Sequence, residues 1–216
     1  MKQLIYKELK LGIHPVVYMF ILFASMLLIP NYPYYVAFFY VCLGIFFIFN
    51  IGRENQDVYY TALLPVPKRD VVKARVLAIA GLELAQLVLA VPVAILSVRL
   101  HPAGNQAGID CNPALFGLAF GMFGGFNLLF IPGFYRTAHK LLRPMLSGCA
   151  FILIYMLAAE ALAQYIPGPV SDYLDATDPA GMLRQLPVLI CGLVFWLGAN
   201  VLAYRLAAKR FAQVDL

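Results

Sequence analysis

Charged residues are scarce in this sequence. Asp, Glu, Lys and Arg make up 12% of the 216 residues, whereas hydrophobic residues make up 62%. Soluble globular domains carry roughly 25% charged and 45–50% apolar residues, so this chain has too little polar surface for an ordinary water-soluble fold. The net charge of +5 is distributed in short pieces between apolar runs, which argues against the continuous basic face of a nucleic-acid-binding protein.

Signatures of metal binding and of nucleotide binding are missing as well. The 4 cysteines are never spaced as CxxC and the 3 histidines lie far apart, so we expect neither a metal site nor an intramolecular disulfide. The dipeptide Gly-Lys does not occur, which excludes the phosphate-binding loop G-x-x-x-x-G-K-[ST]. If ATP drives this protein, the ATPase is a separate polypeptide.

Long apolar runs dominate the chain instead. A transmembrane helix needs roughly 20 predominantly apolar residues, and six runs approach that length. We therefore predict an all-α membrane protein in which residues 1–216 form a single transmembrane domain. The predicted spans are 13–30, 33–51, 76–98, 113–134, 145–166 and 185–206.

Lys and Arg gather on one side of these six spans. If the N-terminus is cytoplasmic, fourteen of the 16 Lys and Arg residues face the cytosol, and only Arg99 and Arg184 face outward. Cytoplasmic loops carry this excess of basic residues in multi-pass membrane proteins. We expect a plasma-membrane protein with both termini cytoplasmic, surrounded by membrane lipid and without a nucleic-acid partner.

Residues 1–12 mix apolar and basic side chains, a pattern typical of a helix that lies in the membrane interface. The alternative is a basic flank that only fixes the topology. After the second span, residues 52–75 form a connection that is long for neighbouring helices. Residues 52–63 can form a helix, with Glu54 and Asp57 near its positive end.

Pro65 is expected to end that helix, because the residue before a proline avoids the α region. Pro67 can then open a second helix at its first position, with Arg69 and Lys73 on one face. This second helix would continue directly into the third span, so a cytosolic protein that moves the charged segment would also move the span. The alternative is a solvated loop that merely obeys the positive-inside rule.

Two ionisable residues fall inside predicted spans, Glu83 and Glu160. A charge at the bilayer centre costs about 2.5–3.5 kcal/mol on insertion scales, so a functional or paired role is expected. Asn50, Asn127 and Asn200 could satisfy Glu83 if they face inward. The four candidates for a substrate path or an intramembrane polar site are Glu83, Asn127, Glu160 and Asn200.

Either glutamate could instead be protonated and hydrogen-bonded across helices, and an ion- or proton-coupled carrier that uses Glu83 or Glu160 is the alternative function. Gly117, Gly121 and Gly125 recur at i,i+4 spacing. Such small residues let two helices approach closely, so we predict helix packing there, within the protomer or at a dimer seam.

Two stretches resemble the small ABC-2 type permeases. The first runs from Leu64-Pro65-Val66 through Lys68-Arg69-Asp70-Val71-Val72 to Lys73 and Arg75. The second is IPGFYRTAHKLLRPM, residues 131–145, where Arg136, Lys140 and Arg143 follow Pro132 and Tyr135. In this second stretch Thr137-Ala138-His139 stand where the family often has a Phe-Gly pair. The six-span layout and the cytoplasmic ends match the family over the whole chain.

The resemblance implies the membrane-spanning subunit of an ATP-driven ABC exporter for an amphipathic or hydrophobic substrate, such as a peptide, a lipid or a drug-like molecule. It implies pairing with a second permease copy or a related permease above cytosolic ATP-binding subunits. ATP and Mg would bind those subunits, and this chain would carry no cofactor and would not itself be an enzyme. The N-terminal segment would be an interfacial elbow helix, and residues 167–187 would form short outer helices, one beginning at Asp178-Pro179.

The resemblance also implies that the first cytoplasmic loop contains a coupling helix seated on the ATP-binding subunit. The residues implied in this contact are Glu54, Asp57, Pro65, Pro67, Lys68, Arg69, Asp70, Lys73, Arg75, Arg136 and Lys140.

Overall fold

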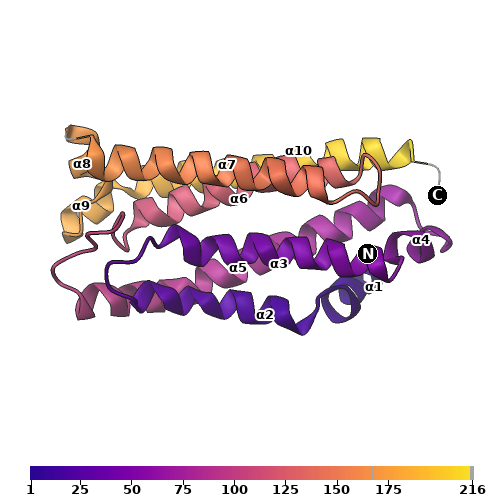
Figure 1. Ribbon diagram of the computed structural model, residues 1–216, viewed down its shortest axis with the longest axis horizontal. Coiled ribbons are helices and arrows are strands. Elements are labelled where there is room, and N and C mark those ends of the chain that lie inside the picture. The colour runs from indigo at the N-terminus through magenta and orange to yellow at the C-terminus, as the bar shows by residue number, and fades with distance from the viewer. Residues whose placement is uncertain (167, 215–216) are drawn as a thin grey trace.

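The computed structural model describes residues 1–166 and 168–214, and these residues form helices and connecting loops, with no strand among them. The long helices run side by side along one axis and form an elongated bundle (Figure 1). This confirms the predicted all-α membrane fold.

Ten α-helices account for most of the described chain. Their bounds are α1 Lys2–Lys7, α2 Pro15–Leu22, α3 Tyr35–Glu54, α4 Asp57–Ala62, α5 Lys68–Leu100, α6 Pro113–Phe134, α7 Leu142–Glu160, α8 Pro169–Leu174, α9 Pro179–Arg184 and α10 Leu186–Ala212. Short segments of tighter or wider helix extend three of them, namely Glu8–Gly12 after α1, Phe23–Leu28 after α2 and Ala161–Tyr165 after α7.

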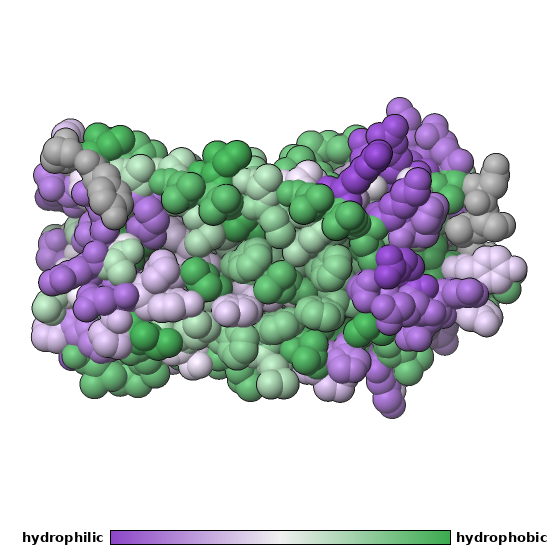
Figure 2. All heavy atoms as spheres, viewed as in Figure 1, coloured by the Kyte–Doolittle hydropathy of each residue, from purple (hydrophilic) through white to green (hydrophobic). Residues whose placement is uncertain are grey.

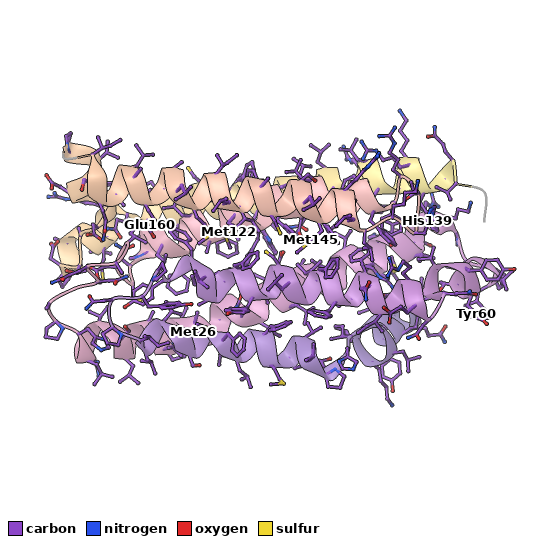
Figure 3. The ribbon with its side chains drawn as sticks, viewed as in Figure 1. Met26, Tyr60, Met122, His139, Met145 and Glu160 are labelled. Carbon is purple, nitrogen blue, oxygen red and sulfur yellow. The ribbon has the colours of Figure 1, made fainter. Side chains whose placement is uncertain are left out.

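The bundle has two polar ends and an apolar middle. We call the end with α1, α4, residues 135–141 and the last turn of α10 the termini end, and the end with residues 101–112, α8 and α9 the cap end (Figure 1). Hydrophilic residues gather at both ends, and hydrophobic residues cover the face between them (Figure 2). Glu160 lies near the cap end, whereas Tyr60 and His139 lie at the termini end (Figure 3).

The first predicted span differs from the structure. In the described chain, five helices are long and apolar enough to cross a membrane, and a sixth crossing requires that Lys2–Gly12 and Pro15–Leu28 count as one span bent by 84°. The bend has a local cause, because Pro15 excludes the α region for His14, whose backbone is extended at φ −71° and ψ 144°. The predicted run 13–30 is therefore a shorter helix, Pro15–Leu28, joined by a sharp corner to the N-terminal helix.

The first loop also departs from the prediction at Glu54. A new helix was expected over residues 52–63, but α3 continues through Glu54 and α4 begins only at Asp57. Gln56 separates the two helices in the left-handed conformation at φ 51°. Pro67 does not occupy the first helical position but precedes it, and α5 then runs without interruption from Lys68 to Leu100.

The glycines of α6 pack inside the protomer, as predicted. A Cβ atom built on Gly192 of α10 would lie 2.0 Å from the backbone oxygen of Gly117, so the two backbones touch. Gly121 and Gly125 receive the rings of Tyr155 and Phe151 from α7. Small residues on α6 therefore allow α7 and α10 to pack closely against it. At the cap end, Asp178 caps α9 by accepting a hydrogen bond from the Gly181 amide, which confirms the predicted helix start.

Candidate functional site

The exposed beginning of α5 is a charged foot, which we define as residues 68–75. Arg69 and Lys73 are exposed and lie one helical turn apart, with 74% of the Arg69 side chain accessible. Arg69 pairs only loosely with Asp70, at 4.0 Å. Because α5 is one continuous helix, the foot is joined without a break to the cap end.

Two other cations of the foot are engaged within the chain. The Lys68 Nζ donates a hydrogen bond to the backbone oxygen of Val214 at 2.7 Å and lies 5.4 Å from the centre of the Phe211 ring. Lys68 therefore ties the start of α5 to the end of α10. Arg75 is only 2% exposed and is the largest fully buried side chain.

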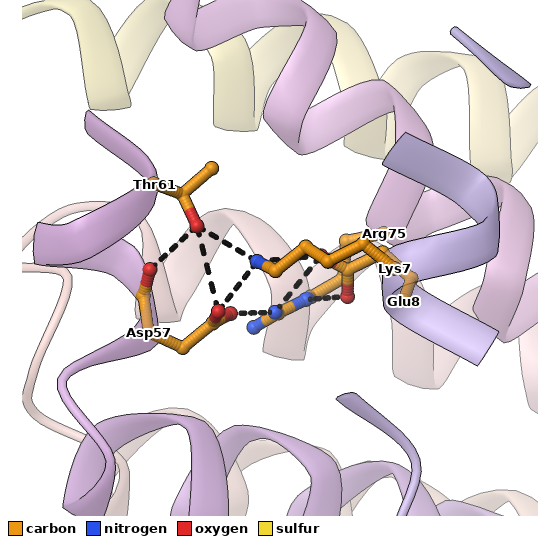
Figure 4. A network of polar contacts seen from close by, with 5 residues as sticks. All are labelled: Lys7, Glu8, Asp57, Thr61 and Arg75. Atoms are coloured by element: carbon orange, nitrogen blue, oxygen red, sulfur yellow. Dashed lines mark hydrogen bonds and ion pairs between the residues drawn. The ribbon is translucent and has the colours of Figure 1, made fainter. Parts of the chain in front are cut away.

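Arg75 is the centre of a buried ion-pair network that joins three separate segments (Figure 4). Its Nε and Nη2 donate to the two carboxylate oxygens of Glu8, at 2.7 and 3.1 Å. Its Nη2 also pairs with Asp57 at the start of α4. Lys7 completes the network, because its Nζ lies 2.5 Å from Asp57 Oδ1 and 2.7 Å from Thr61 Oγ1.

The network has two cations and two carboxylates, so its charges balance. Burial would raise the pKa of Asp57, but the nearby Arg75 and Lys7 outweigh it and the pKa is lowered. Asp57 therefore stays ionised at neutral pH. A carboxylate that accepts both donors of one guanidinium, as Glu8 does, has the strongest geometry available to such a pair. The N-terminal helix, α4 and α5 are consequently locked together at the termini end.

A second polar cluster lies in the middle of the bundle, where α5, α6 and α10 meet. Glu83 is fully buried, and its carboxylate accepts hydrogen bonds from Asn127 Nδ2 at 2.8 and 3.1 Å and from Trp196 Nε1 at 2.7 Å. Asn127 also donates to Asn200 Oδ1 at 3.1 Å. Asn127 and Asn200 thus face Glu83 as predicted.

Asn50, the third candidate partner, does not approach Glu83. It donates instead to Glu54 Oε1 at 2.7 Å on the exposed end of α3. Sequence reasoning missed Trp196, although a single tryptophan in a predicted span carries a donor that needs a partner when buried. The Glu83 cluster is enclosed by helices, so its polar groups act as a cross-link between three spans.

Glu160 belongs to a third site, at the cap end. Its Oε2 accepts a hydrogen bond from the Ile109 amide at 3.0 Å. Gln164, one turn further along, donates to the backbone oxygens of Asn105 and Gly108 at 3.1 and 2.5 Å. Asp110 donates its amide to Asp175 Oδ1 at 2.9 Å. Glu160 and Gln164 therefore fix the loop 101–112 over the bundle.

The match between this chain and known proteins is to a family model. The model of the ABC-2 family transporter proteins matches residues 3–212. The chain belongs to the ABC-2 transporter family. No curated protein and no solved structure matches it. The family match and the apolar helices together identify a multi-pass membrane protein that serves as the transport subunit of an ABC system, a kind of subunit that usually works with a cytosolic ATP-binding subunit.

The predicted contact residues in the first loop of this ABC-2 permease differ in their exposure. Arg75 is buried and Asp57 is half-buried in the network described above, and Lys68 is bound to the end of α10. Asp70 is half-buried. The exposed members are Glu54, Pro65, Pro67, Arg69 and Lys73.

The second loop of the permease lies next to the first at the termini end, because the Tyr135 ring is 5.1 Å from the Phe211 ring, over which Lys68 lies. Arg136 and Lys140 are exposed and line a hollow together with Arg143 and Arg210. Sequence reasoning also missed Lys7 and Glu8 as partners of Arg75 and Asp57. One signal was present, since Glu8 is an isolated acidic residue in an otherwise basic and apolar N-terminal segment.

The cap end of the permease should respond to pH through Asp175. Burial raises its pKa to about 6, with a contribution from the nearby Asp110. A carboxyl group whose pKa is raised in the folded state stabilises the fold at pH values below its unfolded-state pKa. This stabilisation is lost as the pH rises through the folded-state pKa, which is about 6 for Asp175. We expect backbone amides of residues 105–112 to exchange severalfold more slowly at pH 5 than at pH 7, after correction for intrinsic rates. Asp175→Asn should reduce the difference, although Asp110, whose pKa burial also raises, still titrates in this loop. Equal protection at both pH values in the wild type would contradict the prediction.

Proposed function

We propose that this chain is the permease subunit of an ATP-driven exporter that moves an amphipathic or hydrophobic substrate outward. In this proposal the termini end faces the cytosol, because fourteen of the 16 Lys and Arg residues are assigned to that side. A second copy or a related permease completes the pore. ATP and Mg bind to the separate ATP-binding subunit.

The observation that carries the proposal is the continuity of α5. One helix runs from the exposed Arg69 and Lys73 to the cap end, and close to its start it is clamped to the N-terminal helix and to α4 through Arg75. A cytosolic subunit that pushes on the foot would therefore move three segments as one body. Arg69, Asp70 and Lys73 form the proposed docking surface, with Glu54, Pro65 and Pro67 beside them.

Arg75 and Asp57 have a different role in this proposal. They act as positioning residues, because their charges are turned toward Glu8 and Lys7 inside the protein. Lys68 likewise positions the foot against α10. Arg136 and Lys140 were predicted to contact the same subunit, and this stays a prediction; both line a basic hollow.

Charge reversal at the foot tests the proposal. In proteoliposomes that contain the ATP-binding subunit, Arg69→Glu/Lys73→Glu should lower efflux of an amphipathic dye per ATP hydrolysed by about tenfold or more, because the reversed charges repel the former partner. Thermal stability should not change, since both side chains are exposed.

The matched control is Arg205→Glu/Lys209→Glu, which reverses two exposed cations one turn apart on α10. This control should keep the wild-type ratio of efflux to hydrolysis. If the foot variant and the wild type showed the same ratio of efflux to hydrolysis, the charges of the foot would serve only to fix the membrane topology.

A further inference from the structure

A basic hollow opens on the side of the bundle at the termini end. It has a volume of about 510 Å³ and lies between the end of α6, the start of α7 and the last turns of α10. Four of its lining side chains are cations, contributed by three segments of the chain. These cations are Arg136, Lys140, Arg143 and Arg210.

Among residues 1–166 and 168–214, no carboxylate forms an ion pair with these four cations. The ion pairs in this described part of the chain involve only the N-terminal helix, Asp57 and the foot of α5. Arg210 Nη1 donates to the backbone oxygen of Pro132 at 2.8 Å, which holds this guanidinium at the hollow. Like charges brought together repel one another, so an anion bound among them would be stabilised by all four.

The surface next to the hollow is apolar and faces outward along α7. Leu142 is 70% exposed and Leu146 is 59% exposed, beside the cations at the start of the helix. Leu153, Ile154 and Leu157 continue this exposed face toward the cap end. A ligand that fits both features has an anionic head at the polar end of the bundle and hydrocarbon chains parallel to α7.

We propose that this hollow binds the phosphate-bearing head group of an anionic phospholipid, with its acyl chains against the exposed leucines of α7. Arg143 lies on the same helix as Leu142 and Leu146, so head group and chains meet one continuous surface. Basic pockets between transmembrane helices are suited to such head groups. Ser147, one turn further along α7 than Arg143, also lines the hollow, and its hydroxyl donates to the backbone oxygen of Pro144 at 2.8 Å. This site is distinct from substrate transport, and its occupancy depends on the anionic phospholipid content of one leaflet.

Native mass spectrometry of the full chain in detergent tests the site. The probes are phosphatidylglycerol, phosphatidylcholine and soluble glycerol phosphate, and the compared variants are Arg136→Gln/Arg143→Gln and the control Arg205→Gln/Lys209→Gln. We expect the wild type and the control to prefer phosphatidylglycerol over phosphatidylcholine. The hollow variant should bind phosphatidylglycerol about tenfold or more weakly, since each of the two basic residues contributes about fivefold in affinity for an anionic lipid.

Any of the following three outcomes would overturn the proposal. An equal loss of phosphatidylglycerol binding in both double variants would mean that the lipid binds to the general positive charge of the termini end. Glycerol phosphate bound as tightly as the lipid would identify a site for a free phosphate compound. Unchanged lipid binding in the hollow variant, with weaker capture of the ATP-binding subunit, would assign the hollow to a protein partner.

Discussion

Replacing Arg75 with glutamine is expected to destabilise the protein by about 3–5 kcal/mol, the usual cost of removing one partner from a buried ion pair. Glu8 is only 3% exposed and would lose both of its guanidinium donors. Asp57 would keep Lys7 but lose Arg75. The loss should appear in equilibrium unfolding in mixed detergent micelles, read by far-UV circular dichroism.

Two further variants assign the effect to the network. Arg53→Gln removes an exposed arginine at the same end, whose side chain binds only Asn50, and should change the unfolding free energy by less than about 0.5 kcal/mol. Glu8→Gln/Arg75→Gln should cost less than the sum of the two single changes, because residues that contact each other are not additive. A cost for Arg75→Gln no greater than that for Arg53→Gln would contradict the proposed clamp.

The second large effect is expected at Gly192. A Cβ atom at this position would lie 2.0 Å from the Gly117 oxygen and 2.7 Å from its carbonyl carbon, and these are backbone atoms that cannot rotate away. Gly192→Ala must therefore push α6 and α10 apart, which would also strain the hydrogen bonds between Glu83, Asn127 and Trp196 across the same helices. We expect a loss of about 3 kcal/mol, at the upper end of the usual cost of overpacking.

The same helix supplies the control for this change. Gly198→Ala places its new methyl group where no atom lies within 4 Å, and alanine favours a helix over glycine by roughly 0.5–1 kcal/mol. It should therefore leave the unfolding free energy unchanged or raise it slightly. Similar effects of the two substitutions would mean that α6 and α10 are not in backbone contact.

The spans and their polar residues could largely be predicted from the sequence. The apolar runs are long enough to cross a bilayer, and a buried glutamate must find donors. Of the three asparagines predicted as possible partners of Glu83, Asn127 donates to it, Asn200 accepts from Asn127, and Asn50 lies elsewhere. Glycine spacing predicted the close packing of α6 for the same kind of reason, since only small residues allow backbone contact.

The tertiary pairs could not be predicted in this way. Glu8 and Arg75 are 67 residues apart, and no periodicity links an N-terminal helix to the foot of a later span. The sharp corner before Pro15 and the left-handed Gln56 arise from single residues inside otherwise helical patterns. For this reason the corner before Pro15 and the break between α3 and α4 were not predicted.

Surface labelling of the foot tests the central claim most directly. Lys73→Cys would be treated with a membrane-impermeant maleimide in right-side-out and inside-out vesicles, with and without the ATP-binding subunit, and compared with the wild type. We expect labelling above the wild-type level only when the cytoplasmic face is accessible, and protection when the ATP-binding subunit is bound. Labelling of intact right-side-out vesicles, or labelling unaffected by the ATP-binding subunit, would contradict the account that this subunit drives α5 from the cytosol.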